Sequence, residues 1–309
     1  MRKVLILNQF YFRNNSIDGA VYKVSYEMLF RNISFFLKPL RFVHELLGLP
    51  FFQIWYIKNW EQIFKGYDLI ILHDSPQKHA NYFIKKITEF SDKGTKLKLY
   101  YWNQVYDLDR LQLNDRWEVL SFDYKDAVEN NMRYVGGFFL PDPVRKLIPS
   151  IDLFFVGTDK GRFKFLREFE KDLNKQKIKT LFILVSIKRK VSKVYSRAIP
   201  YNEVLENVLR SKGIVDITKE GQVGLTLRAY EALFYDKFLV SNNSYLKNYD
   251  FFEPEKIYIL EKNKEDAQHI AEFLNNTPAV YSKEIKQRYS FEAWLERIDH
   301  NIELDNVHL

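Results

Sequence analysis

The stretch from position 213 to position 243 constrains the fold more than any other part of the chain. A short apolar run at 214–217 is typical of a buried strand, and a polar, glycine-containing loop follows it at 218–224. Residues 226–235 then have the apolar spacing of a helix, and residues 238–241 form the next apolar run. Strand, loop, helix and strand in this order predict a parallel crossover unit, whose ligands collect at the carboxyl ends of its strands. We therefore expect a functional site around residues 221–228.

Three polar residues sharpen this expectation. Thr226 is the expected N-cap of the helix, which places Ala229 rather than Glu231 at the capping-box position. Arg228 lies in the first helical turn, where a cation opposes the helix dipole, and Glu231 follows three positions later on the same face. An exposed Arg–Glu helix pair is one interpretation of this arrangement, and a ligand-binding pair is the other.

A second glycine-containing turn lies at 157–162, after an apolar run at 151–156 and before a predicted helix at 163–174. An anion bound there would meet backbone N–H groups, the positive end of the helix and the cations of Lys160 and Arg162. Gly157 and Gly161 allow the backbone to approach a ligand closely. The turn therefore predicts a phosphate site, with a solvated basic turn as the alternative.

Both segments resemble those of a known family. Residues 231–242, Glu-Ala-Leu-Phe-Tyr-Asp-Lys-Phe-Leu-Val-Ser-Asn, look like the EA-small-x-x-G-x-P-V-V-x-S segment of bacterial GT-B glycosyltransferases. Residues 155–162 look like the V-G…K-G loop of the same family. The resemblance covers about half of the chain, all in its C-terminal half, and points to enzymes of capsule and lipopolysaccharide gene clusters, including the CgeB-like group.

The resemblance implies an α/β fold with two Rossmann-like doubly wound domains facing a cleft. It implies that Glu231 holds the ribose hydroxyls of a nucleotide donor. It further implies a set of residues that hold the donor diphosphate, namely Gly157, Lys160, Arg162, Thr226 and Arg228.

The sequence departs from the family pattern at several points. Many retaining members have a second Glu seven residues upstream, but Val223 occupies that position. Asp236 stands where the family often has Gly, and no Arg directly follows Gly157. The choice between a retaining and an inverting reaction therefore stays open.

The alternation of strands and helices continues along the whole chain, which excludes short-period repeats. We expect strands at 4–7, 68–73, 96–102, 117–122, 133–140, 151–156, 180–187 and 257–260, and helices at 20–31, 77–90, 123–131, 201–211, 265–275 and 282–299. Prolines at 141, 143 and 149 indicate a linker. The predicted domains are an acceptor-side domain at 1–145, a nucleotide-sugar domain at 146–280 and a C-terminal helical segment at 281–309 that returns to the first.

The charge and the apolar runs limit the partners. A net charge of +7 and a pI near 9.1 favour an anionic partner, and the absence of cysteine fits a reducing cytosol. The longest uncharged runs are too short for a membrane span, which needs about 20 residues. Residues 33–60 are dense in aromatic and basic side chains, which indicates either core helix packing or a patch at a membrane interface. We expect a cytoplasmic protein that at most lies against the inner face of the cell membrane.

Three side chains in the N-terminal half are candidates for a catalytic base, which an inverting transfer needs to take the acceptor proton. Asp18 lies in a loop beside Gly19, where ordinary turn chemistry is the alternative explanation. His73 and Asp74 follow a predicted buried strand. Asp18 is the preferred candidate.

Two further motifs stay secondary. Asp107-Leu108-Asp109 has the D-x-D form that metal-dependent transferases use, but we expect no metal and no cofactor. Lys188 and Arg189 open a basic run after a predicted strand, which offers further anion contacts or a solvated loop.

The sequence thus predicts a glycosyltransferase that moves a sugar from a nucleotide diphosphate to a polysaccharide or lipid-linked acceptor in bacterial surface glycan synthesis. Its expected partners are the donor, the acceptor and the membrane surface, without nucleic acid. The alternatives are a nucleotide-sugar epimerase of the same fold and a non-catalytic protein that binds anions or membranes.

Overall fold

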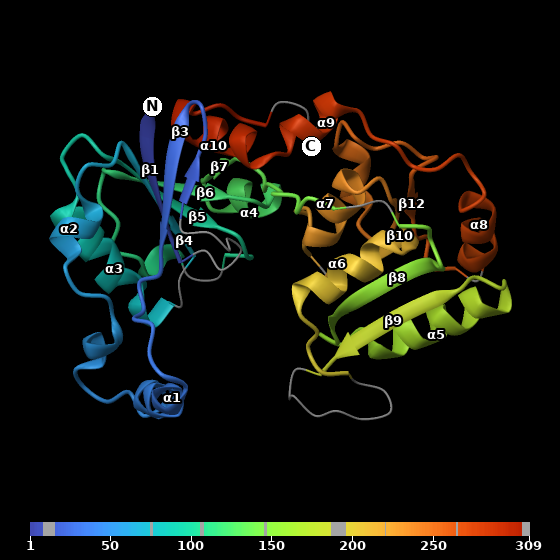
Figure 1. Ribbon diagram of the computed structural model, residues 1–309, viewed down its shortest axis with the longest axis horizontal. Helices are drawn as coiled ribbons and strands as arrows, with labels where there is room; N and C mark the ends of the chain where they lie inside the picture. The colour runs from blue at the N-terminus through green and yellow to red at the C-terminus, as the bar shows by residue number, and fades with distance from the viewer. Residues whose placement is uncertain are drawn as a thin grey trace. The chain divides into compact units, whose positions relative to one another are not determined.

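The protein is an α/β protein with two mainly parallel sheets, each accompanied by helices (Figure 1). The computed structural model describes residues 1–8, 16–74, 77–105, 108–144, 147–186, 196–219, 221–263 and 265–304, without the side chains of 16–18, 61, 77 and 78. The described chain divides into two compact units, one with residues 1–122 and 126–134 and the other with 123–125 and 135–309. This confirms the predicted fold class.

The first unit contains a sheet of seven strands with the order β2-β3-β1-β4-β5-β6-β7 in the described residues. Neighbouring strands are parallel except β2 and β3. The strands are β1 (Arg2–Leu7), β2 (Ser16–Asp18), β3 (Tyr22–Glu27), β4 (Leu69–His73), β5 (Lys96–Tyr101), β6 (Trp117–Ser121) and β7 (Arg133–Tyr134). From β1 the chain continues to β3 on one side, and it later returns to β4 on the other side. The position between β1 and β4 is therefore a topological switch point, where doubly wound sheets bind ligands.

Apolar composition explains why β1 and β4 are the central strands. Every residue of β4 is buried, as are the last four residues of β1, which suits strands covered on both faces. The helices of this unit are α1 (Lys38–Leu46), α2 (Trp60–Phe64), α3 (Gln77–Phe90) and α4 (Tyr124–Glu129), the last of which crosses the boundary between the units. Short 3-10 helices occur at Phe35–Leu37, Phe52–Trp55 and Leu108–Arg110.

The second unit contains five parallel strands with the order β12-β11-β10-β8-β9. They are β8 (Ile151–Thr158), β9 (Thr180–Val185), β10 (Ser211–Asp216), β11 (Phe238–Ser241) and β12 (Ile257–Ile259). The helices are α5 (Phe163–Lys175), α6 (Tyr201–Leu209), α7 (Leu227–Phe234), α8 (Asp266–Phe273), α9 (Lys283–Arg288) and α10 (Phe291–His300), with a 3-10 helix at Ser244–Asn248. Because right-handed crossovers in opposite directions place their helices on opposite faces, α5 and α6 cover different sides of β8 and β9 (Figure 1).

Helix α10 belongs to the second unit and packs on residues 135–138. Arg297 donates from Nε to the carbonyl oxygen of Val135 at 3.0 Å and from Nη2 to that of Gly137 at 3.3 Å. The rings of Phe138 and Trp294 lie 4.4 Å apart between centroids. The segment before β8 and the C-terminal helix therefore form one packed layer.

One local prediction is wrong, and another holds for only part of its segment. Residues 22–27 form strand β3 rather than part of a helix at 20–31, because Tyr22, Val24 and Tyr26 are buried in strict alternation with exposed or half-buried residues. The apolar residues at 21, 24, 28 and 29 also fit a helical spacing, so the sequence did not reveal the strand period of two in residues 22–27. Helix α1 has no buried residue, whereas Trp55 and Tyr56 are buried, so core packing explains only the C-terminal part of the aromatic segment at 33–60.

No helix in the described ranges is both long enough and apolar enough to cross a bilayer.

Candidate functional site

The candidate site lies at the carboxyl ends of β8 and β10 in the second unit. The chain leaves β8 toward β9 on one side and later returns to β10 on the other, so β8 and β10 flank the topological switch point. The loops that follow two such strands separate and leave room for a ligand between them. These loops are the basic turn at 159–162 and the segment at 217–226, the two places that the sequence predicted to form one site.

Arg162 joins the two loops. Its Nη1 donates to the carbonyl oxygen of Ile217, its Nη2 donates to that of Thr158 at 2.7 Å, and its Nε donates to that of Asp159 at 3.3 Å. A Cβ on residue 157 would lie 3.2 Å from Nη2, so Gly157 leaves room for the guanidinium. The close approach that Gly157 permits is thus made by Arg162 itself, and much of the donor capacity of Arg162 is used within the protein.

The turn before α5 is tight and already partly capped. Lys160 has φ 44° and Gly161 has φ 84°, and both therefore adopt the left-handed conformation. Asp159 accepts a hydrogen bond through Oδ1 from the backbone N–H of Phe163 at 2.8 Å. The backbone N–H group of Phe163, which was expected to meet an anion, is therefore already occupied. The Lys160 side chain is exposed to solvent.

A pocket of about 500 Å³ opens beside Arg162. Among the described residues that line it, three carry a positive charge and none carries a negative charge, namely Arg162, Lys219 and Lys262. Two aromatic side chains, Phe165 and Tyr245, also line the pocket, together with the polar groups of Thr218, Gln222, Asn242, Asn243 and Ser244. Cations, amides and aromatic rings in one hollow fit a ligand that carries phosphate groups and a planar base.

Two asparagines after β11 hold the second wall of this pocket in place. Asn242 accepts hydrogen bonds through Oδ1 from the backbone N and the hydroxyl of Thr218, at 2.7 and 3.1 Å. Asn243 donates from Nδ2 to the carbonyl oxygen of Val223 at 3.1 Å. These bonds connect the end of β11 to the loop after β10.

Asp123 fixes the same loop from a distant part of the chain. Its Oδ2 accepts hydrogen bonds from the backbone N–H groups of Val223, at 3.0 Å, and Gly224, at 2.8 Å. The side chain is 1% exposed, and its partners lie 100 and 101 positions later. Sequence reasoning missed this residue, since the only signal was a lone Asp just after a predicted strand.

Helix α7 begins as predicted. The hydroxyl oxygen of Thr226 accepts hydrogen bonds from the backbone N–H groups of Arg228, at 3.1 Å, and Ala229, at 3.4 Å, which confirms Thr226 as the N-cap. Glu231 forms an ion pair with Arg228 through Oε2, and the Glu231 side chain is completely buried while that of Arg228 is 17% exposed. The pair is therefore not the exposed helix pair of the simpler interpretation.

Glu231 is incompletely satisfied. Among the described residues, its Oε1 has no hydrogen-bond partner. Burial raises the pKa of Glu231, while Arg228 and a hydrogen bond with the Tyr201 side chain oppose this. A buried carboxylate oxygen without a donor costs free energy, so a ligand hydroxyl that reached it would be bound favourably.

Asp216 adds a second carboxylate at the end of β10. Burial raises its pKa to about 6, while a hydrogen bond with Thr226 and the positive charges of Arg228 and Arg162 lower it. The charge of Glu231 raises it further. Asp216 thus interacts electrostatically with both Arg162 and Arg228.

The catalytic candidates all lie in the first unit. Asp74 follows β4 at the switch point, where its Oδ2 accepts from Asn103 at 2.8 Å and burial raises its pKa. His73 is 3% exposed and contacts Tyr100, and burial lowers its pKa to about 3, which keeps the ring neutral. Asp18 belongs to the edge strand β2 rather than to a loop, and its side chain lies outside the described part.

Other predicted residues lie outside the described ranges. These are Lys188, Arg189 and Asp107. Asp109, the second carboxylate of the D-x-D motif, lies in the 3-10 helix at Leu108–Arg110. The described His, Asp and Glu residues form no group of three that could hold a metal ion.

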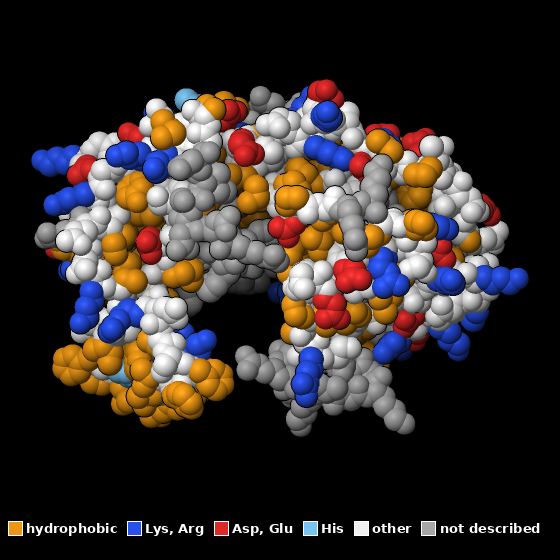
Figure 2. All heavy atoms as spheres, in the orientation of Figure 1, with side chains coloured by type: hydrophobic (Ala, Val, Ile, Leu, Met, Phe, Trp, Pro, Cys, Tyr) orange, Lys and Arg blue, Asp and Glu red, His pale blue; other side chains and the backbone are white. Residues whose placement is uncertain are grey.

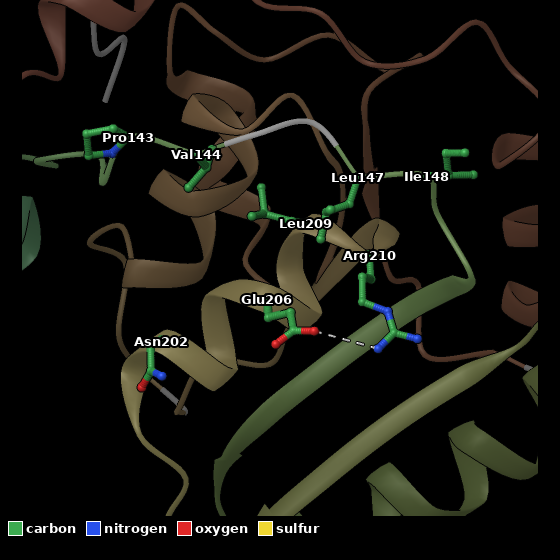
Figure 3. Close-up of a pocket in the computed structure, with 8 residues that line it drawn as sticks. All are labelled: Pro143, Val144, Leu147, Ile148, Asn202, Glu206, Leu209 and Arg210. Carbon is green, nitrogen blue, oxygen red and sulfur yellow. Dashed lines mark ion pairs between the residues drawn. The ribbon is translucent and has the colours of Figure 1, made fainter.

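A wider hollow of about 730 Å³ lies beside α6 (Figure 3). Its polar lining is Asn202 and an ion pair of Glu206 with Arg210 at 3.9 Å, and the remaining lining is apolar. None of the predicted site residues that the structure describes lines it. We therefore place the candidate site in the smaller pocket at the switch point, which Arg162 lines.

Comparisons with known proteins gave the following results. No family model matches the chain, and no curated protein matches it. Among solved structures, a DNA-modifying β-glucosyltransferase, studied with and without uridine diphosphoglucose, is 16% identical with a TM-score of 0.44, covering 98% of this chain and 94% of its own. AviGT4, a glycosyltransferase of avilamycin A biosynthesis, is 12% identical with a TM-score of 0.49, covering 98% and 97%. An α1,3-fucosyltransferase with GDP-fucose is 14% identical with a TM-score of 0.38, covering 99% and 92%.

These similar structures are glycosyltransferases. At these levels of similarity the fold assignment rests on the strand order of this chain, and any functional assignment rests on its pocket.

Proposed function

We propose that the chain is a glycosyltransferase that binds a nucleotide diphosphate sugar in the pocket beside Arg162. The observation that carries the proposal is the lining of that pocket, to which Arg162, Lys219 and Lys262 bring positive charge and no described acidic side chain belongs. A diphosphate needs such cations, and a nucleobase can stack on Phe165 or Tyr245. The location at a switch point supports the same conclusion.

The diphosphate would be held by backbone and side-chain groups of the two loops. Lys160 contributes a long-range positive charge, and Arg162 shapes the pocket through its bonds to Thr158 and Ile217. Because protein cations neutralise the diphosphate in this arrangement, the proposed reaction is independent of metal.

Glu231 is proposed to bind the donor ribose. Since its side chain is fully buried and paired with Arg228, the proposal has the Arg228 side chain turn away to admit the ligand. Arg228 would then exchange the Glu231 carboxylate for the diphosphate, and a ribose hydroxyl would donate to the Oε1 atom that has no described partner. In this exchange Arg228 keeps an anionic partner, and Glu231 replaces its ion pair with a hydrogen bond from the ribose.

In the chemical step, an acceptor hydroxyl oxygen forms a bond to the anomeric carbon while the bond from that carbon to the diphosphate oxygen breaks. The negative charge that develops on the leaving diphosphate is stabilised by the basic side chains. If the reaction inverts, the acceptor proton passes to a base, and we propose Asp74 rather than His73, which is 3% exposed. A polysaccharide or lipid-linked acceptor of bacterial surface glycan synthesis follows from the sequence resemblance.

The proposal is tested by thermal shift with UDP, GDP, CMP and ADP. A nucleotide that binds only the native state raises the melting temperature, with about 2.7 kcal/mol of stabilisation at a hundredfold excess over Kd. We expect one nucleoside diphosphate to do so, and a Lys219→Glu, Lys262→Glu variant to lose the effect. If no nucleotide shifts the transition, the proposed donor site is wrong.

A further inference from the structure

Helix α1 presents its faces in the reverse of the usual order. In a helix at the surface of a soluble protein, polar side chains face water and apolar ones face the core. Here the Arg41 guanidinium lies 5.3 Å from the centroid of the Phe30 ring, and Glu45 lies 3.4 Å from Nε2 of His79. The polar face of α1 therefore packs on the rest of the protein, and its apolar face is exposed.

The outward face belongs to a longer surface, residues 31–58, which we call the apolar segment. Its most exposed hydrophobic side chains are Phe35 at 77%, Phe36 at 87%, Phe42 at 64%, Leu46 at 68%, Leu47 at 63% and Phe51 at 70%. Figure 2 shows hydrophobic side chains gathered over α1 at the lower left. Contiguous apolar patches of this kind are rare on soluble proteins unless something covers them.

The apolar segment is a folded structure rather than a loose loop. Trp55 Nε1 donates to Nδ1 of His44 at 2.9 Å, which leaves His44 Nε2 to donate to the carbonyl oxygen of Pro50 at 2.8 Å. The Phe52 ring stacks on His79 of α3 with centroids 4.7 Å apart, so α3 supports the segment. The exposed apolar side chains are therefore held in a fixed arrangement.

The charges of the apolar segment are strongly biased. It contains four basic residues, Arg31, Lys38, Arg41 and Lys58, and a single acidic one, Glu45, which contacts His79. A second copy of the chain on this surface would bring like charges together, which disfavours a symmetric dimer. Aromatic and aliphatic side chains fringed by Lys and Arg instead match the boundary between acyl chains and anionic headgroups.

We propose that the apolar segment docks on the surface of an anionic lipid bilayer. The Phe42 and Leu46 face enters the boundary between headgroups and acyl chains, and the Lys38 and Lys58 ammonium groups meet lipid phosphates. The helix lies in the plane of the surface, since its nine residues are too few to cross it. This inference concerns the first unit alone and does not depend on the proposed donor site.

Vesicle co-sedimentation tests the inference. We expect the full chain to bind vesicles of phosphatidylcholine with phosphatidylglycerol, to bind phosphatidylcholine vesicles at least tenfold more weakly, and to dissociate as salt is added. Phe42→Ser with Leu46→Ser should abolish binding. Lys38→Glu with Lys58→Glu should weaken binding to anionic vesicles by roughly tenfold or more, since each basic residue contributes about a fivefold factor.

The matched control is Val280→Ser, which removes a 65% exposed apolar side chain from the second unit and should leave vesicle binding unchanged. Because the substituted side chains are exposed, every variant should keep the wild-type melting temperature and any nucleotide-induced shift. Absence of vesicle binding, equal binding to both vesicle types, or self-association that the Phe42→Ser, Leu46→Ser variant removes would each overturn the inference.

Discussion

Arg162 donates to the carbonyl oxygen of Ile217 and thereby ties the turn after β8 to the loop after β10. The two residues are 55 positions apart in the chain, and their hydrogen bond bridges the two loops at the topological switch point of the second sheet. A residue that was expected to bind a ligand directly is therefore also part of the frame that holds the pocket open.

Replacing Arg162 should affect both stability and ligand binding. Arg162→Ala leaves the carbonyl oxygens of Thr158 and Ile217 without this donor, and we expect a loss of roughly 3 kcal/mol in the free energy of unfolding. Lys160→Ala, at an exposed position, should leave urea denaturation unchanged and weaken nucleotide binding only a few-fold. Equal stability of both variants would show that the bonds of Arg162 are unimportant.

Asp123 should preorganise the pocket loop. Asp123→Ala removes the acceptor of three backbone N–H groups, those of Lys125, Val223 and Gly224, and we expect a loss of roughly 2 kcal/mol together with weaker nucleotide binding. Asp123→Asn keeps one side-chain oxygen and should restore most of both properties. Calorimetric titration of nucleotide into the three proteins checks this, and a full loss in the Asn variant would point to charge rather than hydrogen bonding.

Glu231 should discriminate between ribose and deoxyribose. If its Oε1 receives a ribose hydroxyl, the wild-type protein binds a ribonucleoside diphosphate at least tenfold more tightly than the deoxy form. Glu231→Gln should reduce this ratio toward one, whereas Glu231→Ala should also cost roughly 3 kcal/mol of stability by leaving Arg228 without its partner. A ratio that survives in the Gln variant would remove Glu231 from the donor site.

The raised pKa of Asp216 should make the free energy of unfolding fall as the pH rises and the Asp216 carboxyl loses its proton. Burial raises its pKa from 3.8 to about 6, so between these values the native state binds more protons than the unfolded state. Its contribution to the free energy of unfolding is therefore greatest below about pH 4 and is lost by about pH 6 to 7, with an upper limit of about 3 kcal/mol. Asp216→Asn should match wild type near pH 4 and exceed it at pH 7 in urea denaturation, and a constant difference would contradict the assignment.

Asp74 is the testable base of an inverting reaction. Asp74→Asn should lower kcat by a factor on the order of 100 or more while nucleotide affinity stays unchanged. Because burial raises the pKa of Asp74, the acidic limb of the wild-type rate profile should lie above the usual carboxyl range, where the carboxylate becomes protonated and inactive. A profile without such a limb would exclude Asp74 from proton transfer.

Local signals in the sequence predicted much of the second unit. The helix at 226–235 was found as α7, and Thr226 caps it, because capping and helical spacing depend on residues within a few positions of each other. Because such signals are local, they also produced the error at β3. The apolar residues there fit both the helical period and the strand period of two, and only the pairing of β3 with β1 distinguishes the two structures.

By itself, the sequence determined the alternation of strands and helices and the cap of α7. It also determined that polar, glycine-containing loops follow the buried strands at 151–156 and 214–217. Only the tertiary structure decided that β8 and β10 are neighbours, that Asp123 reaches a loop 100 positions away, and that α1 turns its apolar face outward. The physical reason is that periodicity records which residues share a face, whereas the partner of that face depends on contacts between segments that the local pattern does not encode.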